Sequence, residues 1–281
     1  MASIEQSLSP LPASSASYAA PRQLHIVLGV ARQVFLRSVA IVVLLAAWEL
    51  LPRLHLVEPA FLPPFSEVLT TAWQLIRSGE LAGHIVASLS RSLLGFGLAI
   101  ATGVPLGLLM GWYKGFERAV SPLLESLRNT ASLALLPVFI LFLGIGETSK
   151  ISLIVYACSW PILLNTLSGV RNVDPLLVKF GRTMGLSPLQ LFRKVILPAA
   201  VPTIFVGIRL AGATSLVVLV AAEMIGAKAG LGYLIIYSQY NFQIPNMYVG
   251  IITITAIGLL FNQLLVHLER RFTSWKPAAQ E

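Results

Sequence analysis

Six apolar runs, separated by short polar or basic stretches, dominate the pattern of hydrophobic positions along the chain. A helix that crosses a bilayer needs about 20 mostly apolar residues, and the runs approach or exceed this length. We therefore predict an all-α membrane protein with six transmembrane helices. The expected spans are Ser38–Leu51 (extended backwards by Phe35 and Leu36), Leu89–Trp112, Ser132–Ile145, Ile151–Val170, Leu197–Ala222 and Met247–Leu268.

Three stretches of the pattern are less regular. The third run is short, so we expect its helix to start earlier, near Leu123. Leu231–Tyr237 is too short to span, which favours a segment that dips partly into the membrane from the outer side. In the long outer loop Pro52–Ser88, the stretch FLPPFSEV predicts an amphipathic helix that begins at Ser66, because the prolines prevent an earlier start.

Composition supports the membrane class: 56% of the 281 residues are hydrophobic and only 11% are charged, whereas soluble domains carry roughly 25% charged residues. The net charge of +8 does not indicate a nucleic-acid partner, because the basic residues lie in loops between apolar runs. With the N-terminus inside, fourteen Lys and Arg residues fall on the cytoplasmic side and five on the outer side. This bias places both termini in the cytoplasm.

Residues 1–34 are rich in Ser, Ala and Pro and predict a flexible cytoplasmic segment that ends in a short amphipathic helix. They lack the basic start and apolar middle of a secretory signal. Residues 35–281 are expected to form one transmembrane domain with its core at about 85–270. Within the second span, Gly95, Gly97, Gly103 and Gly107 predict close packing against another helix. Cys158 is the single cysteine, which excludes an intrachain disulfide and a cysteine-based metal site, and no metal site is expected.

The loop at 171–194 carries two helix-start signals in DPLLVKFGRTMGLSPLQLFRKVILP. Asp174 followed by Pro175 predicts a capped helix, and Gly185 predicts its end. Ser187 followed by Pro188 predicts a second short helix. The segment is therefore expected to form a capped helical hairpin between two membrane spans.

One face of the first hairpin helix is apolar, with Leu176, Leu177, Phe180 and Met184 on it, while Lys179 and Arg182 point away. Such a face fits docking to another protein. It also fits packing on the chain's own spans or on lipid headgroups, and the pattern leaves both interpretations open.

The hairpin resembles the coupling loop, or EAA loop, of ATP-binding-cassette (ABC) importer permeases. In that pattern a glycine stands ten positions before an aliphatic residue, which is followed by any residue and then Leu-Pro; here these are Gly185, Val195 and Leu197-Pro198. The Glu-Ala-Ala start of the pattern is replaced by Lys179-Phe180-Gly181. Further stretches resemble the nitrate, sulfonate and taurine branch of these permeases, namely Arg128–Ile151, Leu164–Asp174, Val206–Ala211 and Val220–Ile235.

The resemblance implies a type I importer permease fold and a hairpin that docks in a groove of a cytoplasmic ATPase dimer. The residues expected to take part are Asp174, Leu177, Phe180, Arg182, Gly185, Ser187, Leu197 and Pro198. The chain has no G-x-x-x-x-G-K-[ST] loop, so ATP and Mg²⁺ are expected on the separate ATPase, and this chain is expected to be neither an enzyme nor a cofactor carrier. Implied partners are a second permease subunit (a copy of this chain or a paralogue), a periplasmic substrate-binding protein and membrane lipid, but not nucleic acid.

A small set of polar residues within the predicted spans forms the candidate translocation pathway. Arg209 inside the fifth span costs about 2.5–3.5 kcal/mol on insertion scales, so it should face the protein interior or a wet cavity. It fits either an anion pathway or a structural ion pair. Glu223 fits either a pair with a basic neighbour or the outer mouth that receives the binding protein. The predicted pathway residues are Asn129, Thr130, Asn165, Arg209 and Glu223.

The sequence thus predicts the membrane subunit of an ATP-driven importer for a small anion of the alkanesulfonate, taurine or nitrate class. Import of a heterocyclic vitamin precursor by the same kind of machine stays open, because a separate binding protein selects the substrate. An ion-coupled secondary transporter would require acidic residues deep in several spans, and only Glu49 and Glu223 come close.

Overall fold

The computed structural model describes residues 39–273, and every regular element in this part of the chain is helical. The predictions for residues 1–34, and for the start of the first span, lie outside the described residues. A helix covers residues 39–53. It is followed by α2 (Phe65–Arg77), α3 (Glu80–Trp112), α4 (Lys114–Arg128), a 3₁₀ turn (Ser132–Leu135), α5 (Leu136–Leu143), α6 (Glu147–Arg171), α7 (Pro175–Thr183), α8 (Pro188–Leu191), a π turn (Phe192–Ile196), α9 (Leu197–Met224), α10 (Leu231–Tyr240) and α11 (Ile244–Phe272).

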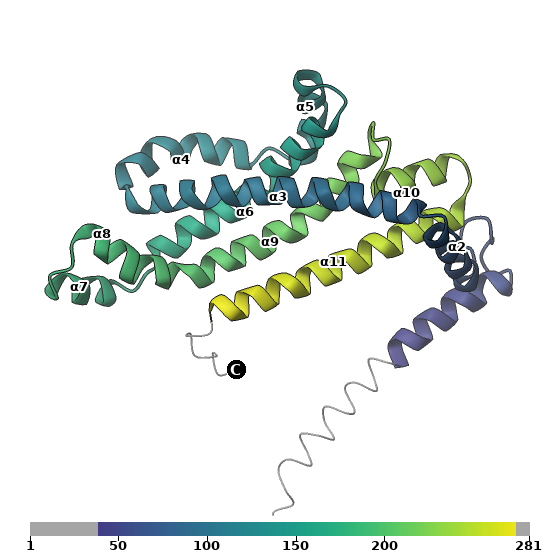
Figure 1. Cartoon of the computed structure of the whole chain (residues 1–281), viewed down its shortest axis with the longest axis horizontal. Coiled ribbons are helices and arrows are strands. Elements are labelled where there is room, and N and C mark those ends of the chain that lie inside the picture. Colours follow the sequence, from purple (N-terminus) through teal and green to yellow (C-terminus); the bar gives the residue numbers. More distant parts are fainter. Residues whose placement is uncertain (1–38, 274–281) are drawn as a thin grey trace, which may run out of the picture.

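The long helices α3, α6, α9 and α11 run along the long axis of the molecule (Figure 1). The short helices α7 and α8 lie at one end, here called the hairpin end. Helices α2 and α10 lie at the opposite end, here called the α10 end, and α5 projects from the side. The main hydrophobic core lies between α3, α6 and α9.

A stripe of small residues on α3 brings it close to α6. A β-carbon on Gly95 would stand 2.7 Å from Ile154 Cγ2, and one on Gly107 would stand 2.7 Å from Thr166 Cβ. The predicted contact at Gly103 and Gly107 is therefore confirmed, because neither position has room for a side chain. Gly97 lies off this stripe: within residues 39–273 no other helix comes within 4 Å of its β position, so the close packing expected there is not found.

Four helices of the described part are long and apolar enough to cross a membrane, namely Glu80–Trp112, Glu147–Arg171, Pro188–Met224 and Ile244–Phe272. A fifth span arises if the bent pair Lys114–Arg128 and Ser132–Leu143 is counted as one. The described residues thus contain four or five candidate spans. The helix at 39–53 continues the pattern of the first predicted span, whose start is not described.

The prediction of one third helix that starts near Leu123 is wrong. The chain bends by 85° between α4 and the helix that begins at Ser132. Pro137 lies in the first turn of α5, where its missing N–H costs no helical hydrogen bond, so a new helix starts there readily. The apolar run thus belongs to a short helix whose Leu141 and Phe142 are 80% and 79% exposed.

Two helix starts also differ from expectation. Helix α3 begins at Glu80 rather than Leu89, so Arg91 lies well inside the helix instead of at the outer end of a span. Helix α2 begins at Phe65, and Ser66 does not cap it. The carboxylate of Glu49 does so instead, because it accepts hydrogen bonds from the Ser66 N–H and Oγ, both at 2.9 Å.

Candidate functional site

Both helices of the 174–198 hairpin carry the predicted caps. Asp174 Oδ1 accepts a hydrogen bond from the Leu176 N–H at 2.8 Å, which starts α7. Ser187 and Gln190 cap α8 reciprocally, each side chain accepting from the other residue's N–H. Between the helices Gly185 adopts φ +74°, a conformation that other residues rarely adopt. The local conformation of the hairpin is therefore fixed by residues within it.

The inner face of α7 packs on α8 through Gly181. This residue is buried, and a β-carbon on it would stand 2.7 Å from Leu191 Cδ1. Val178 and Leu186 also belong to this small apolar cluster. Gly181 occupies the third position of the Lys179-Phe180-Gly181 substitution, so the departure from Glu-Ala-Ala keeps a small residue where the two helices touch.

The outer face of α7 is exposed. Leu176, Leu177, Phe180 and Met184 are 71%, 49%, 63% and 68% accessible to solvent. The alternative in which this stripe packs on the chain's own spans is therefore wrong. Lys179 and Arg182 are exposed as well, so the hairpin presents an apolar stripe bordered by positive charge.

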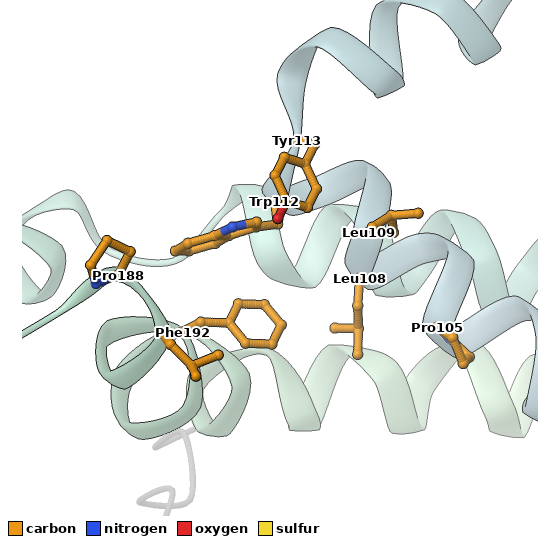
Figure 2. Close-up of a pocket in the computed structure, with 8 residues that line it drawn as sticks. Pro105, Leu108, Leu109, Trp112, Tyr113, Pro188 and Phe192 are labelled. Atoms are coloured by element: carbon orange, nitrogen blue, oxygen red, sulfur yellow. The ribbon is translucent and has the colours of Figure 1, made fainter.

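Aromatic packing ties the hairpin to the membrane helices. The Trp112 and Phe192 rings meet edge to face with centroids 5.0 Å apart, which joins the end of α3 to the π turn. Figure 2 shows both rings beside an apolar groove of about 450 Å³, which Leu108 and Pro188 also line. The hairpin is thus packed against the ends of α3 and α9 and is not a free loop.

The predicted start of the fifth span at Leu197 is not a break between the hairpin and a membrane helix. The helix continues without interruption from Pro188 to Met224. The π turn at Phe192–Ile196 lies directly before Pro198. A proline removes one hydrogen bond and crowds the preceding turn, and the wider π turn accommodates this within a continuous helix.

A second group of polar residues gathers at the α10 end, around Arg91 of α3. Arg91 is 5% exposed. Its Nη1 donates to Glu223 Oε1 at 2.7 Å and to the Ala229 carbonyl at 2.6 Å. Its Nε and Nη2 form a fork with the carboxylate of Glu147 at the start of α6. One guanidinium therefore joins α3, α6, α9 and the turn before α10.

The first turn of α10 is capped by side chains from other helices. The Gly230 N–H donates to His84 Nδ1 at 3.1 Å, and the Leu231 N–H donates to Ser88 Oγ at 2.7 Å. The Gly232 N–H donates to Glu223 Oε2 at 2.9 Å. These N–H groups have no partner within their own helix, so α3 and α9 satisfy them.

Lys150 completes the cluster. It is 3% exposed, and its Nζ donates to the carbonyls of Gly146 and Gly226 at 3.0 and 3.4 Å. The charges of Arg91 and Lys150 balance those of Glu147 and Glu223. Buried charges are costly unless they are paired and hydrogen-bonded. Arg91 and Glu223 meet both conditions, whereas Lys150 is hydrogen-bonded to two carbonyls.

The five predicted pathway residues do not meet. Glu223 lies in the cluster at the α10 end. Arg209, partly exposed, pairs with Glu269 of α11 at 3.0 Å. Asn165 donates to its own helix at the Pro161 carbonyl, and Asn129 and Thr130 lie at the bend after α4. Within residues 39–273, no hydrogen bond or ion pair joins any two of the five.

Sequence reasoning missed Arg91 and Glu147, because Arg91 stood at the outer end of a predicted span and Glu147 stood in the outer loop between two spans. A usable signal was present, since His84, Ser88 and Arg91 are spaced by four and three residues and therefore share one helical face. That face carries a cation and two polar groups toward a span that ends in Glu223.

Comparisons with known proteins agree with this architecture. The family model described as "Binding-protein-dependent transport system inner membrane component" matches residues 103–274. The putative aliphatic sulfonates transport permease protein SsuC of Bacillus subtilis is 37% identical over 83% of this chain and 85% of its own length. The taurine transport system permease protein TauC of Escherichia coli is 34% identical over 89% of this chain and 92% of its own.

A third relative, the nitrate import permease protein NrtB of Synechocystis, is 34% identical over 83% of this chain and 86% of its own length. Among solved structures, a chain from inward-facing conformations of the MetNI methionine ABC transporter aligns with a TM-score of 0.59. It is 20% identical and covers 72% of this chain and 97% of its own, which supports the type I importer fold.

These matches show an inner-membrane subunit that is not the ATPase. The family description also implies that such a subunit works with a binding protein and an ATPase. The chain belongs to the family of binding-protein-dependent transport system inner membrane components, the permeases of ABC importers, and its relatives include sulfonate, taurine and nitrate permeases.

Proposed function

We propose that this chain forms the translocation path of an ABC importer for a small anion of the alkanesulfonate, taurine or nitrate class. The names of three relatives support the substrate class, since they are described as permeases for aliphatic sulfonates, taurine and nitrate. The hairpin end faces the cytoplasm and the α10 end faces the periplasm, in agreement with the excess of Lys and Arg at the hairpin end. Both termini then lie in the cytoplasm.

The observation that carries this proposal is the exposed apolar stripe on α7. Phe180 and Met184 are more than 60% exposed on a helix that its own caps hold rigid. Burial of such side chains in a groove of a cytoplasmic ATPase removes apolar surface from water at about 25 cal/mol per Å². The basic residues Lys179 and Arg182 border the contact, and the ATPase binds the ATP and Mg²⁺.

Two copies of this chain surround one central path, with one ATPase subunit docked on each hairpin. The homodimer is the simplest closed arrangement for a chain with this number of spans. A periplasmic binding protein delivers the anion to the α10 ends. Closure of the ATPase dimer on ATP then moves the hairpins and opens the path to the outside.

Reconstitution of the chain with its ATPase subunit and binding protein in proteoliposomes tests the proposal. Taurine, a short alkanesulfonate and nitrate are offered in turn, and ATP turnover and uptake of the labelled anion are measured. We expect one of the three to stimulate both activities, and only when all components are present. The control is a liposome that lacks the ATPase subunit.

Three results would contradict the proposal. Stimulation by a heterocyclic compound, with no response to any of the anions, would replace the substrate class. Uptake that continues without the ATPase would indicate an ion-coupled transporter. A purified permease that binds no ATPase subunit would remove the coupling role of the hairpin.

A further inference from the structure

The four charged residues at the α10 end (Arg91, Glu147, Lys150 and Glu223) are not equally buried. Glu223 is fully buried, and Arg91 and Lys150 are nearly so, whereas the side chain of Glu147 is 60% exposed. Separation of Arg91 from Glu223 would leave two buried charges with neither an ionic partner nor water around them. Separation of Arg91 from Glu147 would return one carboxylate to water, which costs far less.

The hydrogen bonds divide the cluster in the same way. On one side of Arg91, Glu223 also accepts from Ser88 Oγ and the Gly232 N–H, so α3, α9 and the start of α10 form one network. On the other side, the Arg91 fork is the hydrogen-bonded contact of Glu147 with α3. The hydrogen-bonded link of α6 to this network is therefore one exposed carboxylate at its first residue, while the close packing of α6 on α3 lies further along the helix, at Gly95 and Ile154.

We infer that Arg91 is a positioning residue for the outer gate, which is the closed contact of the start of α6 with the Arg91–Glu223 network at the α10 end. The fork between Arg91 and Glu147 is the contact that breaks when the path opens to the outside. Arg91 and Glu223 remain together through the cycle and hold the turn before α10. Glu147 leaves Arg91 as the start of α6 moves away. This inference rests on the proposed function, which assigns the α10 end to the periplasmic side.

The neighbouring contacts suit this division. Lys150 holds the Gly226 carbonyl at 3.4 Å, which is the upper limit for a hydrogen bond. Gly226 also lies against Ile145, because a β-carbon on it would stand 2.8 Å from Ile145 Cγ2. When Glu147 separates from Arg91, the long hydrogen bond of Lys150 and the van der Waals contact of Ile145, which lies just before α6, still join this segment to the turn.

Thiol accessibility provides the test, in the complete transporter with its ATPase and binding protein in nanodiscs. Cys158 is replaced by Ala, and Ser149, which is 1% exposed in the first turn of α6, is replaced by Cys. The rate at which a membrane-impermeant maleimide labels this thiol then reports whether the start of α6 has separated from Arg91. In this background we expect slow labelling without nucleotide and rapid labelling with binding protein and a slowly hydrolysed ATP analogue.

Glu147→Gln in that background should label at least about fivefold faster without nucleotide, the change that about 1 kcal/mol produces. Its rate with the ATP analogue should equal that of the parent, because the open state is the same. The matched control is Glu117→Gln, which removes an ion pair with Arg171 of 2.7 Å at the hairpin end. That variant should label at the parent rate in both conditions.

A second measurement separates gating from simple loss of structure. Glu147→Gln should keep a melting temperature near that of the parent, whereas Glu223→Gln should lower it markedly because Arg91 is left without its buried partner. Equal labelling rates for Glu147→Gln and the parent would overturn the inference. So would a fall in melting temperature for Glu147→Gln as large as that for Glu223→Gln. Anion uptake by the parent transporter tests the proposed function separately.

Discussion

Gly181 touches Leu191 so closely that a β-carbon at residue 181 would stand 2.7 Å from the leucine Cδ1. This contact sets the angle between α7 and α8, and with it the direction in which the exposed stripe points. The hairpin thus has two faces with different requirements. The inner face needs small and apolar residues for packing, and the outer face is free for a partner.

Gly181→Val should disrupt the hairpin. The added side chain forces Leu191 from its position, which costs about 1–3 kcal/mol as overpacking. We expect lower thermal stability and less ATPase subunit retained on co-purification. Leu191→Ala in the same chain should restore part of the thermal stability and part of the retained ATPase subunit, because it makes room for the valine. Gly115→Ala is the control, because its β position has no atom within 4 Å; equal effects at the two glycines would contradict the packing argument.

Phe180→Ala should leave the permease folded but weaken its association with the ATPase. The ring is 63% exposed, so its removal changes the isolated chain by less than about 0.5 kcal/mol. Buried aromatic anchors at interfaces cost more than about 1 kcal/mol on truncation, so affinity should fall roughly fivefold or more. The measurement is titration of the ATPase subunit onto permease in nanodiscs. Leu123→Ala, an equally exposed residue on α4, should bind as the parent does.

Gly107→Leu should prevent α3 from packing on α6. Its β-carbon would stand 2.9 Å from the Leu163 carbonyl oxygen, and backbone atoms cannot rotate away. We expect a loss well above about 1 kcal/mol, seen as an early melting transition in detergent. Gly97→Leu on the same helix is the matched control and should melt near the parent temperature. If both variants behaved alike, the stripe would have no packing role.

Arg209 and Glu269 should act as a pair. Each is partly exposed, so solvent screening limits the contribution to about 1 kcal/mol or less. Arg209→Gln and Glu269→Gln should each lower stability slightly, and the double variant should lose little more than either one. Strictly additive losses would show that the two do not interact. A large increase in the KM for the anion in Arg209→Gln alone would instead support the pathway role.

The sequence predicted what depends on nearby residues. The caps at Asp174 and Ser187 use partners two or three positions away, so the hairpin was foreseeable in detail. The spans around α6, α9 and α11 follow from apolar length and were right to within a few residues.

The features that the sequence did not reveal depend on distant partners. Arg91 and Glu223 are 132 positions apart, and only the packing of α3 on α9 makes them neighbours. Hydropathy alone placed Arg91 at the outer end of its span, because an arginine usually marks such an end. The bend after α4 was missed for a related reason, since apolar content does not show whether a run is straight.

The uninterrupted helix from Pro188 to Met224 has a mechanical consequence. Its 37 residues span about 55 Å, from the hairpin at one end to Glu223 at the other. Because the helix is continuous, a rotation at one end is transmitted to the other. If it pivots near the hairpin, a tilt of about 5° displaces the Glu223 end by about 5 Å, and hydrogen bonds fail beyond about 3.5 Å. A small rotation imposed on the hairpin is therefore large enough to alter contacts on the opposite side of the membrane.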